Sequence, residues 1–393
     1  MLITKGKTEI TPLEAGYDEK RLDVLHRHFE RLISGNKIMC ASYCASRKGK
    51  VFAAGAIGPL RYDDPEKPLL PDAVNRIASI TKLTATVAVM KLIEDGFFRL
   101  DTPVKELLPE FDFGDFWKIN VYHLLTHTSG MIPDQGYDDL PERDYWACID
   151  EYIQSYDPKK DGDFRWLSAA LKAGVRRAPD AEWQYCSFGF AVLGEIISRV
   201  SGVHANKYIE DEILKPLGMR DSVFDLTPAL AARSIAANER QKKYLDAVAA
   251  GQAGEDKSSE YWDKIPSTGG GLFSTLYDLV KFGNLCLNMG TLGGERILGR
   301  KIFEKITTRA LFGKPNFAWN VNDPDRAYGI GFDMKNGEYI YSPGSFFHEG
   351  AGACALFIDP KEEMVAAYFV PEANGWNAES VYNTQIILWS GLI

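Results

Sequence analysis

A serine and a lysine three residues apart form the first pair in the sequence whose types and spacing could carry out chemistry. Ser79 and Lys82 lie at the start of a segment that is apolar on nearly every side of a helix. This pattern predicts a buried helix over 79–98. Side chains three positions apart on a helix are neighbours, about 5–6 Å apart at Cβ. We therefore expect the hydroxyl and the amine to meet at the N-terminus of this helix.

Burial of the lysine would make this pair reactive. Transfer of an ammonium group into an apolar environment is unfavourable, so the pKa of a buried lysine falls. A neutral amine beside a serine hydroxyl is what general-base activation of a nucleophile requires. The free N–H groups at the N-terminus of the helix would stabilise an oxyanion. The same spacing also fits a capping serine followed by a lysine that extends to the surface, and the pattern alone does not decide between the two.

Strand-like segments at the two ends of the chain, with helical patterns between them, predict an α+β fold. The expected helices are 19–34, 79–98, 188–200, 204–217, 275–287 and 380–389. The expected strands are a hairpin over 38–57 and the segments 328–334, 352–358 and 364–369. One antiparallel sheet that is built from distant segments and flanked by helices accounts for this order. We expect a sheet-containing part over about 1–98 and 267–393, and a mostly helical part over about 99–266.

The composition is that of an ordinary globular protein. Hydrophobic residues make up 45% and charged residues 25% of the 393 residues. The net charge of -9, without a basic cluster, argues against a nucleic-acid partner. No apolar run near the N-terminus has the length of a signal peptide or a membrane span, so we expect a cytoplasmic protein. The six cysteines are scattered without a C-x-x-C pair, and we expect them to be reduced.

Two segments are candidates for the loops that determine substrate specificity, 133–163 and 241–264. The part from 134 to 163 holds ten acidic and three basic residues. A solvated surface excursion accounts for this charge. Several aromatic residues leave open a role as one wall of a substrate cleft, and they are Tyr137, Tyr145, Trp146, Tyr152 and Tyr156.

Several blocks of the chain together resemble a known superfamily, the serine β-lactamase-like and penicillin-binding-protein-like proteins. The blocks occur in the family's order at 79–82, 100–104, 119–130, 183–189, 216–219, 269–275 and 328–331. Within the superfamily, the sequence is most similar to class C β-lactamases, D-alanyl-D-alanine carboxypeptidases, family VIII carboxylesterases and related acyl transferases. The resemblance implies a single catalytic domain over 1–393 with the β-lactamase/transpeptidase-like fold. It also favours the catalytic interpretation of Ser79 and Lys82.

The second motif of this family is Tyr-x-Asn or Tyr-x-Ser, and Tyr185-Cys186-Ser187 fits it. The resemblance implies that Tyr185 lies beside Ser79 and Lys82 and relays a proton to and from the leaving group. A nearby ammonium could lower the pKa of this phenol. Ser187 fits the motif and also fits the N-cap of the helix that follows.

The third motif is Lys-Thr-Gly in many members and His-x-Gly in others, and His348-Glu349-Gly350 matches the histidine form. Gly350 would let the substrate approach a strand edge. The amide of Ala351, with that of Ser79, is the expected oxyanion hole. Glu349 departs from the hydroxyl that is common at this position. Its carboxylate would repel a substrate carboxylate, which favours a neutral substrate.

The resemblance implies a two-step acyl transfer without a cofactor. Ser79, deprotonated by Lys82 and Tyr185 acting as a hydrogen-bonded unit, would attack a small-molecule ester or amide. Which of the two is the base stays open. Water or another acceptor would then release the acyl group. We expect no metal ion, because His123 and His127 lack the intervening glutamate of an H-E-x-x-H zinc site.

The predicted function is therefore that of a carboxylesterase or a related acyl transferase on a small neutral ester. A D-alanyl-D-alanine carboxypeptidase or a β-lactamase would use the same residues on another substrate. An alternative of another class is a non-catalytic sensor or scaffold with the same fold. The sequence leaves open the physiological substrate, the choice between hydrolysis and transfer, and the oligomeric state.

Overall fold

A computed structural model describes residues 3–252, 257–334, 340–373 and 375–393 of the chain. In this part of the chain the main sheet has six antiparallel strands in the order β1-β3-β2-β12-β11-β10. Strand β2 pairs with β12, which joins the two ends of the chain. The expectation of one sheet built from distant segments is confirmed. The strands are β1 (Thr4–Lys5), β2 (Ala41–Arg47), β3 (Lys50–Ile57), β10 (Phe346–Gly350), β11 (Cys354–Asp359) and β12 (Met364–Phe369).

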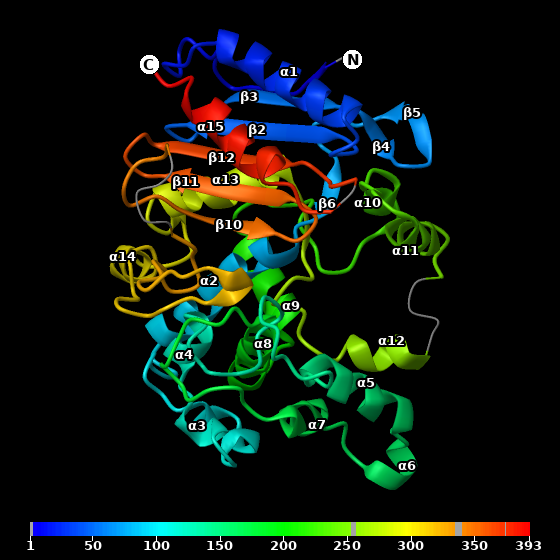
Figure 1. Cartoon of the computed structure of the whole chain (residues 1–393), viewed down its shortest axis with the longest axis vertical. Helices are drawn as coiled ribbons and strands as arrows, with labels where there is room; N and C mark the ends of the chain where they lie inside the picture. Colours follow the sequence, from blue (N-terminus) through cyan, green and yellow to red (C-terminus); the bar gives the residue numbers. More distant parts are fainter. Residues whose placement is uncertain (1–2, 253–256, 335–339, 374) are drawn as a thin grey trace.

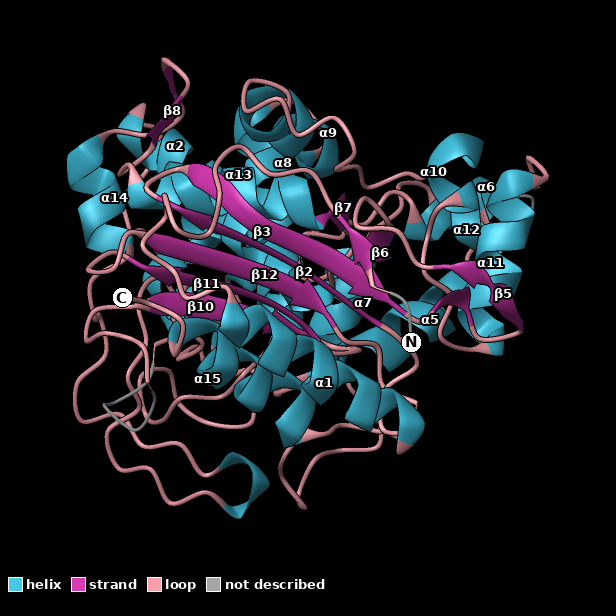
Figure 2. Ribbon diagram, turned by 90° about the horizontal axis from the view of Figure 1, so that it is seen from above, coloured by secondary structure: helices cyan, strands magenta, loops and turns pink. Residues whose placement is uncertain are grey.

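Alternate residues of the sheet enter two separate hydrophobic cores, because successive side chains of a strand point to opposite faces. In β12, Val365 and Ala367 belong to the larger core, and Ala366 and Tyr368 belong to the smaller one. The smaller core is covered by α1 (Lys20–Ser34) and α15 (Thr384–Trp389), which lie together on one face of the sheet (Figure 2). The helices that were expected at 19–34 and 380–389 are confirmed, although a π-helical turn, Glu379–Asn383, precedes α15.

The larger core lies between the other face of the sheet and the helical part of the molecule (Figure 1). Helix α13 (Leu276–Leu287) packs directly on β2, β11 and β12. Helices α2 (Thr81–Glu94) and α8 (Ser187–Ser201) pack on each other below it. The remaining helices are α3 (Val104–Leu107), α4 (Val121–Leu125), α5 (Tyr145–Ser155), α6 (Pro158–Asp161), α7 (Trp166–Ala170), α9 (Ala205–Ile209), α10 (Pro228–Ala232), α11 (Glu239–Ala249), α12 (Lys257–Trp262) and α14 (Arg300–Ile306).

Short two-stranded ladders connect these layers. The ladder of β6 (Val74–Arg76) with β7 (Phe273–Thr275) matters most for the site, because α2 follows β6 and α13 follows β7. Since both helices start from the same ladder, their N-terminal ends are fixed relative to each other. The other ladders are β4 (Pro59–Arg61) with β5 (Asp64–Pro68), and β8 (Thr291–Leu292) with β9 (Glu295–Arg296).

The strand that was expected at 328–334 is wrong. Only isolated bridges occur there, Tyr328 with Asp333 and Asp333 with Phe347. Gly331 has a φ of 73°, in the left-handed region, and the amide of Gly329 donates to the carbonyl of Phe332. The apolar residues of this segment are therefore buried in a turn. Among the described residues, no helix is long and apolar enough to cross a membrane.

Candidate active site

Ser79 lies in a 3₁₀ turn, Ala78–Ile80, between β6 and α2. Thr81 Oγ1 ties the turn to the residue before β7, because it donates to the carbonyl of Ala78 at 2.6 Å and accepts from the amide of Leu272 at 3.2 Å. Ala78 has a φ of 44°, which costs a residue with a side chain about 1–2 kcal/mol. Helix α2 begins at Thr81, two residues later than expected, because this strained turn precedes it. The turn leaves Ser79 half-buried at the edge of a cavity.

Lys82 is fully buried, with 0% of its surface exposed. Its Nζ contacts three oxygens, Ser79 Oγ at 3.1 Å, Ser187 Oγ at 2.9 Å and the carbonyl of Gly269 at 2.6 Å. Burial lowers the pKa of Lys82 from its ordinary value of 10.5 to about 8, although the negative charge of Asp134 opposes this shift. At physiological pH the ammonium form still predominates, but a far larger share of the amine is neutral than for an ordinary lysine.

Tyr185 lies two residues before α8, with its ring centroid 4.8 Å from Lys82 Nζ. Its other neighbours include the rings of His127, at 4.4 Å, and His348, at 6.2 Å. Burial raises the pKa of Tyr185 well above 10, and the nearby Ser79 hydroxyl opposes this shift only in part. The phenol is therefore protonated. The structure thus brings together the three side chains that were expected to be catalytic, from two separate segments of the chain.

Ser187, the first residue of α8, links Lys82 to a carboxylate that the sequence analysis did not single out. Its hydroxyl donates to Asp134 Oδ2 at 2.5 Å, and its amide donates to Asp134 Oδ1 at 2.7 Å. Asp134 is itself held in place, because its backbone amide donates to the carbonyl of Tyr185 at 2.9 Å. Ser187 contacts the lysine as expected, but its expected role as the helix cap is wrong: the N-cap is Cys186, no side chain caps the helix, and Ser187 is the first helical residue.

His348 lies on β10 behind Tyr185, with 4% of its surface exposed. Its Nδ1 lies 2.6 Å from the carbonyl of Glu349, which fixes the proton on that nitrogen. Burial lowers the pKa of His348 to about 4, and the charge of Lys82 acts in the same direction. A neutral imidazole therefore stands where other members of the superfamily carry a lysine. It cannot lower the pKa of Tyr185 as a cation would.

The structure does not bring Glu349 into the cavity. Successive residues of β10 point to opposite faces of the sheet, so the neighbour of His348 points away from Tyr185. Glu349 lies instead close to Tyr368, a residue of the smaller core, and contributes after burial to the raised pKa of that phenol. The expected repulsion between Glu349 and a substrate carboxylate therefore has no structural basis.

Gly350 does not serve the expected approach of the substrate to a strand edge, but the packing of β10. A Cβ atom at this position would lie 2.3 Å from the carbonyl oxygen of Ile77 and 2.4 Å from Cys354 Sγ. Glycine is therefore required for close packing of β10 on the turn that carries Ser79, and Gly350 does not line the cavity. Ala351, the next residue, is exposed and does line it, as does Ser79.

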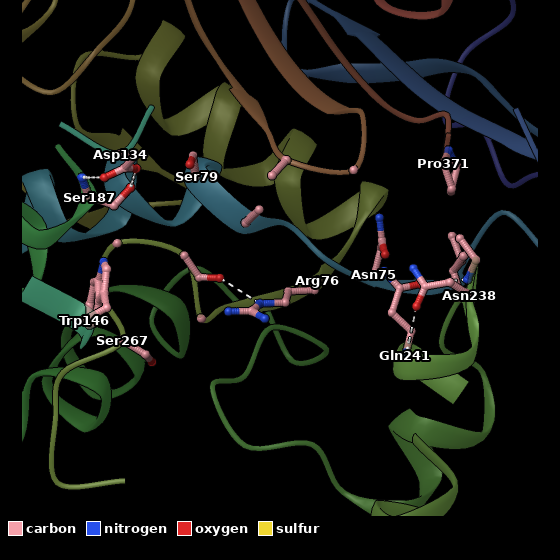
Figure 3. A pocket seen from close by; sticks show the side chains of 18 of the residues that line it. Asn75, Arg76, Ser79, Asp134, Trp146, Ser187, Asn238, Gln241, Ser267 and Pro371 are labelled. Atoms are coloured by element: carbon pink, nitrogen blue, oxygen red, sulfur yellow. Dashed lines mark hydrogen bonds between the residues drawn. The ribbon is translucent and has the colours of Figure 1, made fainter. Parts of the chain in front are cut away.

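The cavity beside Ser79 has a volume of about 790 Å³ (Figure 3). Asp134 and Ser187 stand on one side of Ser79, and Asn75, Asn238 and Gln241 lie at the opposite end of the view. Both candidate specificity segments contribute to the lining, although residues 253–256 lie outside the described residues. The charged lining residues are Arg76, Asp134, Asp263 and Glu372.

The two histidines that were weighed as a metal pair have structural partners. His123 Nδ1 accepts from the amide of Asn120 as part of a helix cap, and His127 Nδ1 accepts from the amide of Cys186 at 3.1 Å. Burial lowers the pKa of His127 well below 6.5. In the ranges that the structure describes, no group of three or more His, Cys, Asp or Glu side chains could hold a metal ion.

Three residues of the site had no role in the sequence analysis, namely Asp134, Gly269 and Arg76. Asp134 was assigned to a solvated excursion, and it does lie at the start of that segment, yet it binds Ser187. Gly269 accepts from Lys82, and a Cβ there would lie 2.9 Å from the carbonyl of Ser187. The run of three glycines at 269–271 was the sequence signal that could have pointed to Gly269. Arg76 lies three residues before Ser79 and had no assigned function.

Together the sheet, the helical part and the cavity at the start of α2 define the β-lactamase/transpeptidase-like fold. The chain belongs to the Beta-lactamase family, whose model matches residues 25–385. Members of this family include serine hydrolases, and two curated relatives illustrate their range. Esterase EstB of Burkholderia gladioli is 31% identical over 222 residues, which are 54% of this chain and 53% of EstB, so the chain spans about half the length of this relative.

Penicillin-binding protein 4 of Amycolatopsis lactamdurans is 28% identical over 320 residues, 75% of this chain and 77% of that protein. Among solved structures, a family VIII carboxylesterase superposes with a TM-score of 0.70 and 18% identity, over 100% of this chain and 99% of that chain. At this level of identity the structural likeness supports the fold alone. The two curated relatives are named as an esterase and as a penicillin-binding protein.

Proposed function

We propose that the protein is a carboxylesterase or a related acyl transferase that forms an acyl-enzyme on Ser79. The observation that carries this proposal is the contact of the Ser79 hydroxyl with the buried amine of Lys82, at 3.1 Å, beside an open cavity. A nucleophile next to a base of lowered pKa is the arrangement that covalent catalysis needs. The similarity to EstB, named as an esterase, favours an ester as the substrate.

The hydrogen-bond directions around Lys82 support the lysine as the base. The carbonyl of Gly269 can only accept, and the hydroxyl of Ser187 gives its single proton to Asp134. A neutral amine has two N–H donors and one lone pair. If the two donors go to Gly269 and Ser187, the lone pair is left for the hydroxyl of Ser79.

Tyr185 is better suited to relaying a proton than to removing one. Its pKa lies well above 10 because it is buried, so the phenolate is scarce at neutral pH. In the proposed reaction, the proton of Ser79 passes to Lys82 as the serine oxygen bonds to the carbonyl carbon. When the intermediate collapses, the Tyr185 phenol protonates the leaving alcohol, and the ammonium of Lys82 restores the phenol.

The oxyanion of the intermediate needs donors on the cavity side of Ser79. We propose the backbone amides of Ser79 and Ala351 for this role, because both residues line the cavity and come from the two segments that Gly350 packs together. Water that enters the cavity, or an alcohol acceptor, would then release the acyl group. The proposed reaction uses no cofactor.

A panel of substrates tests the proposal. We expect turnover of p-nitrophenyl esters of two to eight carbons, and loss of both turnover and covalent labelling by a fluorophosphonate probe in Ser79→Ala. Hydrolysis of nitrocefin or release of D-alanine faster than any ester would favour the β-lactamase or carboxypeptidase alternative. A single burst of acylation without turnover would favour the sensor. Probe labelling that persists in Ser79→Ala would remove Ser79 as the nucleophile.

A further inference from the structure

Arg76 is a cation in the wall of the cavity, three residues before Ser79 (Figure 3). Its Nε donates to the carbonyl of Gly270 at 3.0 Å. Within the described part of the chain, no carboxylate lies within 4.0 Å of the guanidinium and no group accepts from its two terminal nitrogens. Four N–H donors of one side chain are thus available to a molecule in the cavity.

Arg76 is exposed towards the cavity and has no counter-ion among the described residues. Desolvation by the cavity wall lowers the pKa of this guanidinium; Tyr244 opposes this shift, and the positive charge of Arg240 acts in the same direction as desolvation. A cation that is partly desolvated and unpaired gains most from an anion that enters the same space. A planar guanidinium matches the two oxygens of a carboxylate in particular.

Amide groups of α11 and of the residue before it add further donors to the cavity wall. Asn238 Oδ1 accepts from the amide of Gln241 at 3.0 Å, and Gln241 Oε1 accepts from the amide of Ala237 at 2.7 Å. Since both side-chain oxygens are occupied by the backbone, the NH₂ groups of Asn238 and Gln241 are the parts that remain for a ligand. Arg76, Asn238 and Gln241 thus all offer donors to the same cavity.

The carboxyl groups of the cavity do not neutralise Arg76. Asp134 lies on the side of Ser187, to which both of its oxygens are bound. Asp263 and Glu372 also line the cavity, and burial raises the pKa of each. Neither of them is within 4.0 Å of the guanidinium.

We propose that Arg76, with the side-chain amides of Asn238 and Gln241, binds a carboxylate of the substrate, so that the preferred substrates are esters that carry a free carboxylate. This inference rests on the proposed function, because Ser79 must attack the same molecule. It also revises the expectation of a neutral ester, whose basis was a carboxylate, Glu349, that lies outside the cavity.

Two matched pairs of esters test the inference on the intact chain. In one pair the acyl group carries the charge, p-nitrophenyl hydrogen glutarate against p-nitrophenyl valerate. In the other the leaving group carries it, 4-acetoxybenzoate against its methyl ester. In Arg76→Gln, the ratio of kcat/KM for the charged to the neutral ester should fall about tenfold or more in at least one pair, since a charged bidentate contact is lost. The pair that responds identifies the side of the ester bond.

Arg240→Gln is the matched control, because it removes the same charge close to Arg76 from a residue that does not line the cavity. It should leave both ratios within about twofold of the wild type, as expected for a screened surface charge. Arg76→Lys keeps the charge and loses the planar fork, so its ratio should be intermediate. Melting temperatures of the variants show whether loss of the bond to Gly270 harms the fold. If Arg76→Gln does not fold, competitive inhibition by glutarate is measured instead in the wild type and in Arg76→Lys. We expect glutarate to inhibit Arg76→Lys more weakly than the wild type.

The outcomes separate this inference from the proposed function. If the wild type hydrolyses esters through Ser79 but neither ratio differs between the wild type and Arg76→Gln, the carboxylate site is wrong and the esterase proposal stands. An equal fall in Arg240→Gln would also overturn it, because a general field of positive charge would then explain the preference. If no ester is turned over and Ser79 is not labelled, the proposed function itself fails.

Discussion

The hydroxyl of Ser187 donates its only proton to the carboxylate of Asp134, so that towards Lys82 its oxygen can only accept. Asp134 does not contact Lys82 through any hydrogen bond of the described residues, yet it determines which partner receives the lone pair of the amine. A carboxylate at position 134 can only accept, so it takes the proton of the Ser187 hydroxyl and leaves the lone pair of Lys82 free for Ser79. A group that can also donate would not impose this direction. The chemistry at Ser79 should therefore depend on a residue that touches neither Ser79 nor Lys82.

Asp134→Asn tests this dependence with almost no change in shape. The NH₂ group of an asparagine would donate to Ser187, whose proton would then turn towards Lys82 and occupy its lone pair. We expect kcat for p-nitrophenyl esters to fall about 100-fold or more, the usual contribution of a general base. KM should change less, because the cavity keeps its form. Steady-state kinetics with one short ester measure both constants.

Asp138→Asn serves as the control for Asp134→Asn. It makes the same acid-to-amide change four residues later, at an exposed position outside the cavity lining. Its kcat should stay within about twofold of the wild type, as for most surface substitutions. Equal losses in the two variants, or an unchanged kcat in Asp134→Asn, would show that the direction of the Ser187 hydrogen bond does not matter.

The pH profile should report the lysine. Only the neutral amine can accept the proton of Ser79, and burial lowers the pKa of Lys82 to about 8. We expect kcat/KM to rise about tenfold per pH unit at lower pH and to level off above about 8. In Asp134→Asn a negative charge near the amine is lost, so the pKa of Lys82 falls further. The rising part of the pH profile should therefore move to lower pH. A wild-type profile that levels off only near pH 10 would contradict the buried amine as the base.

The sequence predicted the nucleophile region well because its signals are local. Ser79 and Lys82 lie one helical turn apart, and Tyr185 lies two residues before an apolar helix, so motif and helix pattern agreed. That one sheet joins the two ends of the chain also followed from the strand patterns there. These features depend on spacing along the chain, which a sequence displays directly.

The errors came from features that depend on register and on packing between distant segments. Whether Glu349 faces the cavity depends on the phase of one strand, and a shift of one residue reverses it. The need for glycine at 350 comes from Ile77, 273 positions earlier, and no local pattern contains that contact. The partnership of Asp134 with Ser187 is likewise a long-range contact, and the surrounding acidic residues concealed it.

His348 should remain neutral throughout the working range of the enzyme. Burial and the charge of Lys82 lower its pKa to about 4, so its protonated form would appear only near or below that pH. In ¹H–¹³C spectra of the histidine rings, the signal that disappears in His348→Asn should keep the chemical shift of a neutral imidazole from pH 8 to pH 5. A midpoint near 6.5 would mean that the ring is solvated, and the explanation of the high pKa of Tyr185 would have to change.

Gly350→Ala should damage both the fold and the reaction, because its methyl group would need the space of the Ile77 carbonyl, 2.3 Å away. Overpacking of this kind costs about 1–3 kcal/mol. The shift it forces would move the turn that carries Ser79, so kcat should fall together with the free energy of unfolding.

Gly189→Ala, in α8, is the control, because the same added methyl group has room there: its Cβ would meet only Leu124 Cδ2 at an ordinary 3.6 Å. Replacement of a helical glycine by alanine should stabilise the protein by about 0.5–1 kcal/mol. Urea unfolding of the two variants measures both effects, and a Gly350→Ala protein of wild-type stability and activity would refute the packing role of this glycine.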